Sequence, residues 1–168
     1  MKRPKVIVIT GTPATGKTTL AKRLSRSLGY EHIELNKLIG ANKLYEGTDA
    51  LRKCKIVDIR CLNRFLKGYI NGRDPRECPG LILDSHLAHF LPRAYVDVVV
   101  VTSCGLSLLK RRLNRRKYPA EKVRENLDAE IFSVCATEAE EMKHDILPCT
   151  PGSGYADFLK ELRQKLGI

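Results

Sequence analysis

The stretch "GTPATGKT", residues 11–18, constrains this chain more than any other. It matches the pattern G-x-x-x-x-G-K-[ST] at every fixed position and follows the apolar run "KVIVIT" at residues 5–10. Gly11 and Gly16 permit backbone conformations and a close approach that a side chain would obstruct. Successive N–H groups can then surround a phosphate, and the start of the following helix adds a positive dipole. We therefore predict a phosphate-binding loop between a strand and a helix.

Three side chains of this loop have predicted roles. Lys17 is expected to reach the outer phosphates of a nucleotide, Thr18 to ligate Mg²⁺ through its hydroxyl, and Thr19 to add a phosphate contact. Ala14 is expected among the nucleotide-binding residues, at a position where the pattern accepts any residue. ATP and Mg²⁺ are therefore the expected cofactors.

Apolar runs of strand length alternate with helical patterns along the chain. The predicted strands are residues 5–10, 32–35, 81–84, 96–102 and 145–148, and the predicted helices are 18–29, 58–71, 107–117, 119–142 and 155–167. Asp58 is the expected N-cap of the second helix. One face of the helix at 119–142 is expected to carry Val123, Leu127, Ile131 and Val134. This order predicts one three-layer α/β domain with a parallel sheet.

Basic residues outnumber acidic ones, with 30 Lys and Arg against 19 Asp and Glu and a net charge of +11. Such a surface favours polyanions, so RNA or a ribonucleoprotein particle is the expected macromolecular contact. The alternative is a charge balance that serves solubility and nucleotide binding.

The six cysteines form no C-x-x-C pair and no zinc-type spacing with histidine. No run approaches the roughly 18 apolar residues of a membrane span, and the N-terminal apolar run is expected to be a strand rather than a signal peptide. We therefore expect reduced thiols, several of them in the core, and no membrane association. The expected location is cytoplasmic, or nuclear if the source is eukaryotic.

Asp84 and His86 form a second candidate site, at the end of the strand predicted at 81–84. Open α/β sheets bind ligands at the carboxyl ends of their strands. A carboxylate there can orient Mg²⁺ or its waters, and His86 could position an attacking water or contact an acceptor phosphate. The alternatives are a helix cap for Asp84 and an ordinary hydrogen-bonded histidine for His86. His89 is expected to be structural.

The segment "KRRLNRRK", residues 110–117, is strongly basic. A helix cannot direct all of these side chains one way, so some are expected to remain in solvent. Those at its C-terminal end can fold over a triphosphate as a lid, where arginine charge stabilises the transferring phosphoryl group. Arg111 and Arg112 are expected to be solvated or to contact RNA phosphates.

Four further stretches carry a family resemblance. They are "LDSHLAHFLP" (83–92) with its D-x-H motif, "LYEG" (44–47) with Asp49, Cys54 and Asp58 at matching offsets, "RRKYPAEK" (115–122) and "ENLDAEIF" (125–132). Together with the phosphate loop, they resemble the adenylate kinase isoenzyme 6 family, also called the coilin-interacting nuclear ATPases. The resemblance extends from residue 5 to about residue 140, and the compact, basic chain looks like an archaeal member.

The resemblance implies the nucleoside monophosphate kinase variant of the P-loop NTPase fold, with a five-stranded parallel sheet. Residues 1–168 would form a single domain with an acceptor-binding insert at about 35–57 and a short lid at about 114–122. Arg116 matches the family's lid arginine and is expected to bind the phosphates. The implied catalytic residues are Lys17, Asp84, His86 and Arg116, and the implied metal-binding residues are Thr18 and Asp84.

The resemblance also implies two activities. One is phosphoryl transfer from ATP to a nucleoside monophosphate, with AMP as the expected acceptor. The other is ATP hydrolysis coupled to late maturation of the small ribosomal subunit. The implied partners are a small-subunit platform ribosomal protein and, through the basic surface, rRNA.

The stretch "LNKLIGANK", residues 35–43, departs from the family pattern. Gly40 stands where many relatives carry an arginine that can meet the acceptor phosphate. Lys37 or Lys43 could replace it as a point charge, but without the bidentate fork of arginine. We therefore expect water to compete well with a monophosphate acceptor.

A phosphate loop by itself is compatible with three other functions. A small GTPase is excluded because "NRRK" (114–117) lacks the Lys and Asp of the N-K-x-D guanine motif, and no D-x-x-G switch follows the third strand. A metabolic kinase for small molecules and an assembly chaperone that binds nucleotide only as a switch both remain open.

Overall fold

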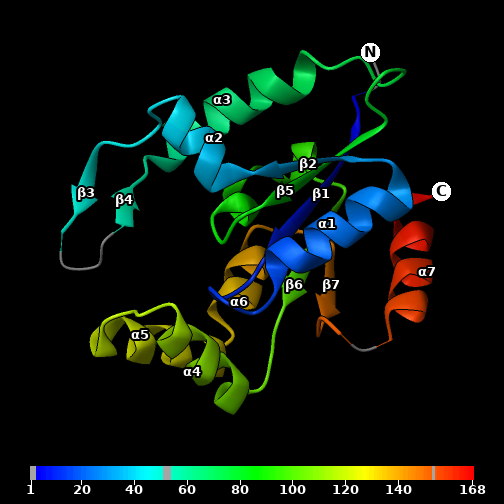
Figure 1. The fold of residues 1–168 in the computed structure, drawn as a ribbon. Helices are drawn as coiled ribbons and strands as arrows, with labels where there is room; N and C mark the ends of the chain where they lie inside the picture. Colours follow the sequence, from blue (N-terminus) through cyan, green and yellow to red (C-terminus); the bar gives the residue numbers. More distant parts are fainter. Residues whose placement is uncertain (1–2, 51–53, 153) are drawn as a thin grey trace.

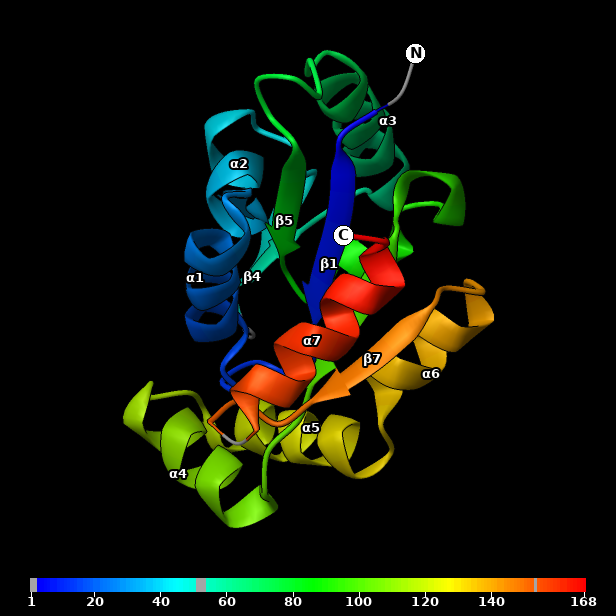
Figure 2. The ribbon, with the colours of Figure 1, turned by 90° about the vertical axis from the view of Figure 1, so that its right-hand side faces the viewer.

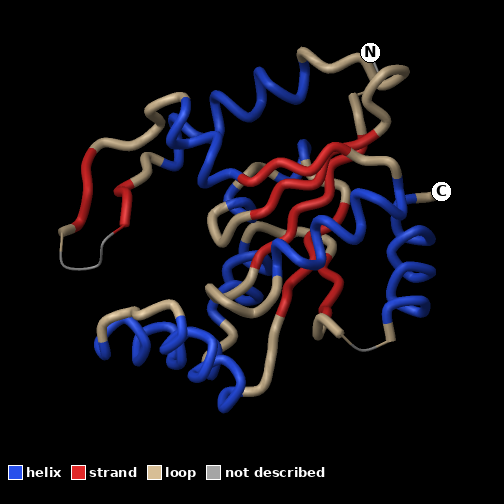
Figure 3. Tube along the Cα trace, viewed as in Figure 1, coloured by secondary structure: helices blue, strands red, loops and turns tan. Residues whose placement is uncertain are grey.

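A computed structural model describes residues 3–50, 54–152 and 154–168 and has a five-stranded parallel sheet at its centre (Figure 1, Figure 3). The strand order is β2-β5-β1-β6-β7. The strands are β1 (Lys5–Thr10), β2 (Glu31–Glu34), β5 (Gly80–Asp84), β6 (Val98–Thr102) and β7 (Ile146–Cys149). Apolar side chains cover both faces of β1, β5 and β6, as continuous apolar runs predict for parallel strands.

Helices pack on both faces of the sheet and give three layers (Figure 2). On one face lie α1 (Lys17–Leu28) and α7 (Tyr155–Leu166), which bury Leu24 and Leu162 against Ile7 of β1. On the other face lie α3 (Ile59–Asn71), α6 (Val134–Glu141) and the 3₁₀ turns η1 (Ala88–Phe90) and η2 (Arg93–Tyr95). The predicted three-layer α/β fold is therefore confirmed.

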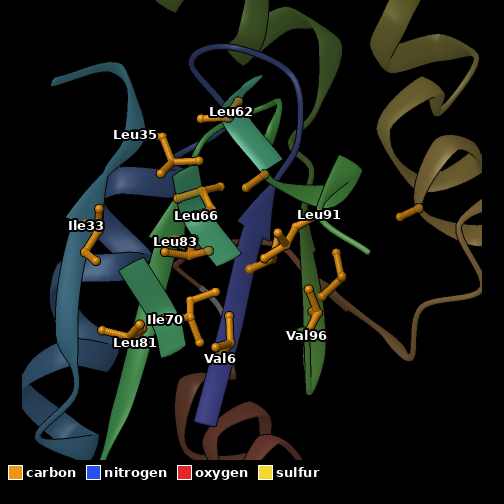
Figure 4. Close-up of a cluster of buried hydrophobic side chains, with 14 of the residues drawn as sticks. Val6, Ile33, Leu35, Leu62, Leu66, Ile70, Leu81, Leu83, Leu91 and Val96 are labelled. Carbon is orange, nitrogen blue, oxygen red and sulfur yellow. The ribbon is translucent and has the colours of Figure 1, made fainter. Parts of the chain in front are cut away.

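Helix α3 shows how the sequence pattern positions a layer (Figure 4). Its carboxylate N-cap, Asp58, accepts hydrogen bonds from the backbone N–H groups of Arg60 and Cys61. Leu62, Leu66 and Ile70 recur every fourth residue, and all three are fully buried in the cluster that covers β1 and β5. Burial of each such side chain contributes about 1.5–3 kcal/mol.

Two excursions project beyond the carboxyl ends of the strands, on the same side of the molecule in Figure 1. The first contains α2 (Leu35–Ala41) and an antiparallel hairpin of β3 (Gly47–Asp49) and β4 (Cys54–Ile56). The second contains α4 (Leu106–Arg115) and α5 (Ala120–Ile131), which pack against each other. The first spans the segment expected to be the acceptor insert, and the second contains the segment 114–122 expected to be the lid; we keep these two names below. The sequence did not predict the hairpin.

The long helix predicted at 119–142 is wrong, because the chain breaks it into α5 and α6. Ser133 adopts a left-handed conformation with φ 51° between the two helices. Of the apolar face expected for that helix, Ile131 and Val134 are 55% and 36% exposed. The break has a physical reason: α5 packs against α4, whereas α6 packs against β6, β7 and η1, so the axis must change between them. A four-residue repeat of apolar side chains carries no information about which neighbour each turn will meet.

The expectation that several cysteines lie in the core holds in part. Among the cysteines whose side chains are described, Cys149 is buried in a core cluster, Cys78 and Cys104 are half-buried against such clusters, and Cys61 is exposed; all are free thiols. The side chain of Cys54 lies outside the described part of the chain.

Candidate active site

The phosphate loop joins β1 to α1 and depends on glycine at two positions. Gly11 has φ 137° and lies so close to β6 that a Cβ would stand 2.4 Å from the carbonyl oxygen of Thr102. Gly16 has φ 108° immediately before α1. No side chain among the described residues caps the first turn of α1, so its N–H groups remain available to an anion.

Ala14 lies in the same loop with φ 72°, a conformation that L-amino acids other than glycine seldom adopt. Its methyl group is buried against Leu109 and Leu113 of α4. Its carbonyl oxygen accepts a hydrogen bond of 3.1 Å from the guanidinium of Arg112. The loop is therefore held against α4 by both apolar and polar contacts.

Lys17 turns back over the loop. Its Nζ donates to the carbonyl oxygens of Gly11 and Thr12, at 2.7 and 2.9 Å. Burial lowers the pKa of Lys17 to about 8, against the opposing effect of the nearby Asp84 carboxylate. A phosphate beside this ammonium would favour its charged form.

A cavity of about 1360 Å³ opens over the loop. Most of the predicted site residues line it, namely Ala14, Gly16, Lys17, Thr18, Thr19, Asp84, His86 and Arg116. Gly11 does not line the cavity, because it lies on the side of the loop that contacts β6. The cavity extends from Lys55 in the first excursion to Tyr118 in the second.

Asp84 ends β5 beside the loop, with 4% of its surface exposed. Its Oδ2 lies 3.4 Å from Nε2 of His32 on the neighbouring strand β2. No hydrogen bond in the described structure makes it a helix cap; the turn that follows β5 is instead supported by the Ser85 hydroxyl, which accepts from the N–H of Leu87. The carboxylate therefore faces the cavity from the carboxyl edge of the sheet.

His86 projects into the open part of the cavity, where its ring still meets solvent. Enclosure by the surrounding walls and the positive charge of Lys17 lower the pKa of His86 to about 4. The ring is therefore neutral at pH 7 and can accept a hydrogen bond.

His89 has the structural role expected of it. The ring is fully buried, and Nδ1 lies 2.8 Å from the Thr10 hydroxyl while Nε2 lies 3.0 Å from the Glu138 carboxylate. Burial lowers the pKa of His89 to about 4, so the ring is neutral. This geometry is satisfied when Nε2–H donates to Glu138 and Nδ1 accepts from Thr10. The histidine thus ties the end of β1 to α6.

Arg116 follows α4 and is exposed at the cavity wall. Its charge contributes to lowering the pKa of Lys17, which shows that the two cations share one electrostatic environment. Two like charges over an anion-binding loop are stabilised when phosphate oxygens lie between them.

Comparisons with known proteins agree with this geometry. A family model described as "AAA domain" matches residues 7–133. The adenylate kinase isoenzyme 6 homolog of Caenorhabditis elegans is 34% identical over 140 residues, which cover 83% of this chain and 74% of the relative. A protein of Methanosarcina barkeri named "Putative adenylate kinase" is 38% identical over 136 residues, which cover 81% and 71%. The chain belongs to the adenylate kinase isoenzyme 6 family.

Solved structures extend the likeness to the whole fold. A shikimate kinase from Acinetobacter baumannii superposes with a TM-score of 0.61 at 14% identity, covering 98% of this chain and 94% of its own. A sugar kinase from Janibacter has a TM-score of 0.64 at 16% identity, covering 98% and 95%. At these identities the likeness shows the fold alone, and it confirms the predicted P-loop kinase type. Within the described residues, every helix is too short or too polar to span a membrane.

The residues present fit a magnesium nucleotide, which the kinase family implies. The described chain gathers no three His, Cys, Asp or Glu side chains into a metal cage. Mg²⁺ in nucleotide sites needs no such cage, because it keeps several waters and takes phosphate oxygens as ligands. Thr18 and Asp84 on the cavity wall would supply the protein ligands of the ion. Lys17 donates hydrogen bonds to loop carbonyls in this structure, and its positive charge suits a phosphate.

Sequence reasoning missed three residues of this site. Arg112 was expected in solvent or on RNA, yet it bonds to the loop and lines the cavity. Glu130 accepts from the Thr12 hydroxyl at 2.6 Å, and Lys55 lines the cavity from the hairpin. The spacing Arg112–Arg116 places both arginines on one helical face and could have revealed the first. Glu130 lies in a stretch that carries the family resemblance, but its partner Thr12 is 118 residues away, and nothing in the local pattern marks Lys55.

Proposed function

We propose that this protein transfers the terminal phosphoryl group of ATP to a nucleoside monophosphate, with AMP as the acceptor that its relatives' names suggest. The observation that carries the proposal is the shared cavity. It joins the phosphate loop, the edge carboxylate of Asp84, the insert and the lid in one space. A transfer enzyme needs donor and acceptor in one such space, from which most water can be excluded.

On the donor side, Lys17 and Arg116 would bind and neutralise the phosphates, aided by the N–H groups at the start of α1. Thr18 and Asp84 would hold Mg²⁺, which supplies charge neutralisation for the phosphate oxygens when bound. Gly16, Thr19 and the backbone at Ala14 complete the nucleotide contacts. Arg112 keeps the loop in place through the Ala14 carbonyl.

On the acceptor side, His86 would orient the attacking group. A monophosphate oxygen is already anionic and needs no general base, so transfer depends on positioning. A water molecule in its place would give ATP hydrolysis, with ADP, phosphate and a proton as products. A neutral imidazole can accept a hydrogen bond from that water. With a pKa of about 4, however, the ring is too weak a base to keep the proton of the water. His86 therefore acts by orientation in both reactions.

One experiment tests the activity directly. The protein is incubated with ATP and Mg²⁺, alone and with each nucleoside monophosphate, and the diphosphate and free phosphate products are quantified. Lys17→Met should abolish both reactions with the circular dichroism spectrum unchanged. Lys22→Met is the matched control, because Lys22 is an exposed lysine of the same helix. Turnover by Lys17→Met at the parent rate would remove the loop from the mechanism.

A role in small-subunit maturation is the second part of the proposal, supported by the family and by the net charge of +11. The partners would be a small-subunit platform ribosomal protein and rRNA, in the cytoplasm or, in a eukaryote, the nucleus. A pull-down from native extract at low and moderate salt tests it. Absence of that ribosomal protein at both salt concentrations would favour a metabolic kinase. Its presence with no turnover by the purified protein would favour a nucleotide-switched chaperone.

A further inference from the structure

Lys55 and Gly40 face each other across the insert. Lys55 belongs to strand β4, and a Cβ placed on Gly40 of helix α2 would stand only 2.8 Å from its Nζ. The ammonium group therefore occupies space that any larger residue at position 40 would take. The glycine and the lysine form a complementary pair across the insert.

The hairpin and an aromatic ring hold Lys55 in this place. In the register of the hairpin, Lys55 pairs with Thr48, and the N–H of Glu46 donates to the carbonyl of Ile56 at 2.9 Å. The ammonium lies 4.7 Å from the ring centroid of Tyr45, a cation–π distance. The position of the charge is thus set by the fold of the insert.

This charge faces the site. Lys55 lines the active-site cavity together with Asn36, Ile39 and Val57 of the insert and His86 from the sheet edge. Among the described residues of the insert, Lys37 and Lys43 are not part of that wall. Lys37 is instead paired with Glu34 at 2.8 Å, and its side chain is 80% exposed. Neither Lys37 nor Lys43 therefore lines the cavity, and among the described residues of the insert Lys55 is the lysine that does.

We propose that Lys55 anchors the phosphate of the acceptor nucleotide, and that Gly40 leaves open the space in which its ammonium lies. This inference rests on the proposed transfer to a monophosphate and names the acceptor's anchor within it. A lysine binds phosphate as a point charge without the fork of arginine. The acceptor would therefore be held by charge with little control of its orientation, which leaves water able to compete.

The first test is the KM for AMP in Lys55→Met, which keeps the apolar stem and removes the charge. The KM should rise about 10- to 100-fold, as for loss of a hydrogen bond to a charged group. ATP affinity and acceptor-free hydrolysis should stay at the parent values. Lys22→Met, on the exposed face of α1 and outside the cavity wall, is the control and should leave every parameter unchanged. An unchanged KM for AMP in Lys55→Met would overturn the proposal.

The second test is the coupling between the two positions. Gly40→Ala displaces the ammonium and should raise the KM for AMP in the parent but not in the Lys55→Met background. Alanine also favours the helix, so this rise cannot come from unfolding of α2. Gly40→Arg in the Lys55→Met background should restore acceptor binding, because it returns a cation to the same space. Equal effects of Gly40→Ala in both backgrounds would refute the pairing.

Calorimetric titration of AMP separates this inference from the proposed function. If the parent binds AMP through Lys55 but transfers nothing to it, the transferase function fails and the anchor stands. If the parent transfers to AMP and Lys55→Met binds AMP equally well, the function stands and the anchor fails. If the parent neither binds AMP nor uses it, both fail.

Discussion

The Thr12 hydroxyl donates a 2.6 Å hydrogen bond to Oε2 of Glu130, which joins the phosphate loop to the last turn of helix α5. The other carboxylate oxygen, Oε1, accepts from the backbone N–H of Cys104 at 3.0 Å. One side chain therefore connects the phosphate loop, the segment that precedes α4 and the last turn of α5. The carboxylate thus fixes the position of the loop relative to these two helices.

Glu130→Ala should lower the free energy of unfolding by about 1–3 kcal/mol, because it leaves two donors without their acceptor. Glu130→Gln should cost less, since its carbonyl can still accept one bond while its amide donates to the Thr12 hydroxyl. Urea denaturation measures both. Asp128→Ala is the control on the same helix, where an exposed side chain should change stability by no more than about 0.5 kcal/mol. If the alanine variants at 128 and 130 are equally stable, the carboxylate does not hold the loop.

The affinity for ATP should fall as the pH rises above about 8, which is the pKa of Lys17 in the free protein. The bound phosphates favour the charged ammonium, so binding raises this pKa. Below about pH 8 Lys17 is already charged and affinity should be constant. Above it, affinity should fall by up to about tenfold per pH unit, because binding requires uptake of a proton.

Calorimetry in two buffers of different ionisation enthalpy measures that proton uptake near pH 8.5. Lys22→Met should retain it, because Lys22 is on the solvent face of α1. A constant ATP affinity from pH 7 to pH 10 would contradict the role given to Lys17. The free protein should instead become more stable as the pH rises from about 8 to 10.5. Over this range Lys17 is neutral in the folded protein while the unfolded chain still binds its proton, so the free energy of unfolding increases with pH.

The order of strands and helices was predictable because each core element carries its own periodicity. The apolar run of β1 and the four-residue repeat of α3 need no knowledge of their neighbours. The break at Ser133 was not predictable, since it follows from α5 and α6 packing on different partners. The short hairpin strands of the insert have little periodicity to detect.

The same distinction holds for the site. Lys17 and Asp84 lie in local motifs whose residue types state their chemistry. Glu130 accepts a hydrogen bond from Thr12, which is more than a hundred residues away in the sequence. Lys55 lies beside Gly40, which is fifteen residues away. Their partners are set by tertiary packing, which a single sequence does not show. The juxtaposition of Lys55 and Gly40 was therefore visible only in the structure.

Gly11 and Ala14 should differ strongly in their sensitivity to substitution, although both have positive φ. Gly11→Ala places a methyl group against the Thr102 carbonyl and should cost at least about 2 kcal/mol of stability, together with most ATP binding. Ala14→Gly relieves the left-handed alanine but loses a buried methyl group and gains backbone entropy in the unfolded state. These effects nearly cancel, so we expect a change within about 1 kcal/mol. Thermal unfolding and ATP titration of both variants check the contrast, and equal losses at the two positions would contradict it.

His86→Ala should lower acceptor-free ATP hydrolysis about 10- to 100-fold, the loss expected when one hydrogen bond to the attacking water is removed. ATP affinity should change by less than about threefold, because Lys17 and the loop, rather than His86, bind the donor phosphates. His86→Asn is the matched variant and should retain part of the rate, since its amide oxygen can still accept a hydrogen bond.

The lowered pKa of His86 adds a test by pH: the ring stays neutral until the pH falls to about 4, so protonation of His86 should not slow hydrolysis between pH 8 and pH 6. Hydrolysis and ATP binding are measured across that range for all three proteins. The assignment fails if His86→Ala hydrolyses ATP at the parent rate, or if a loss of rate centred near pH 6.5 is present in the parent and absent from His86→Ala.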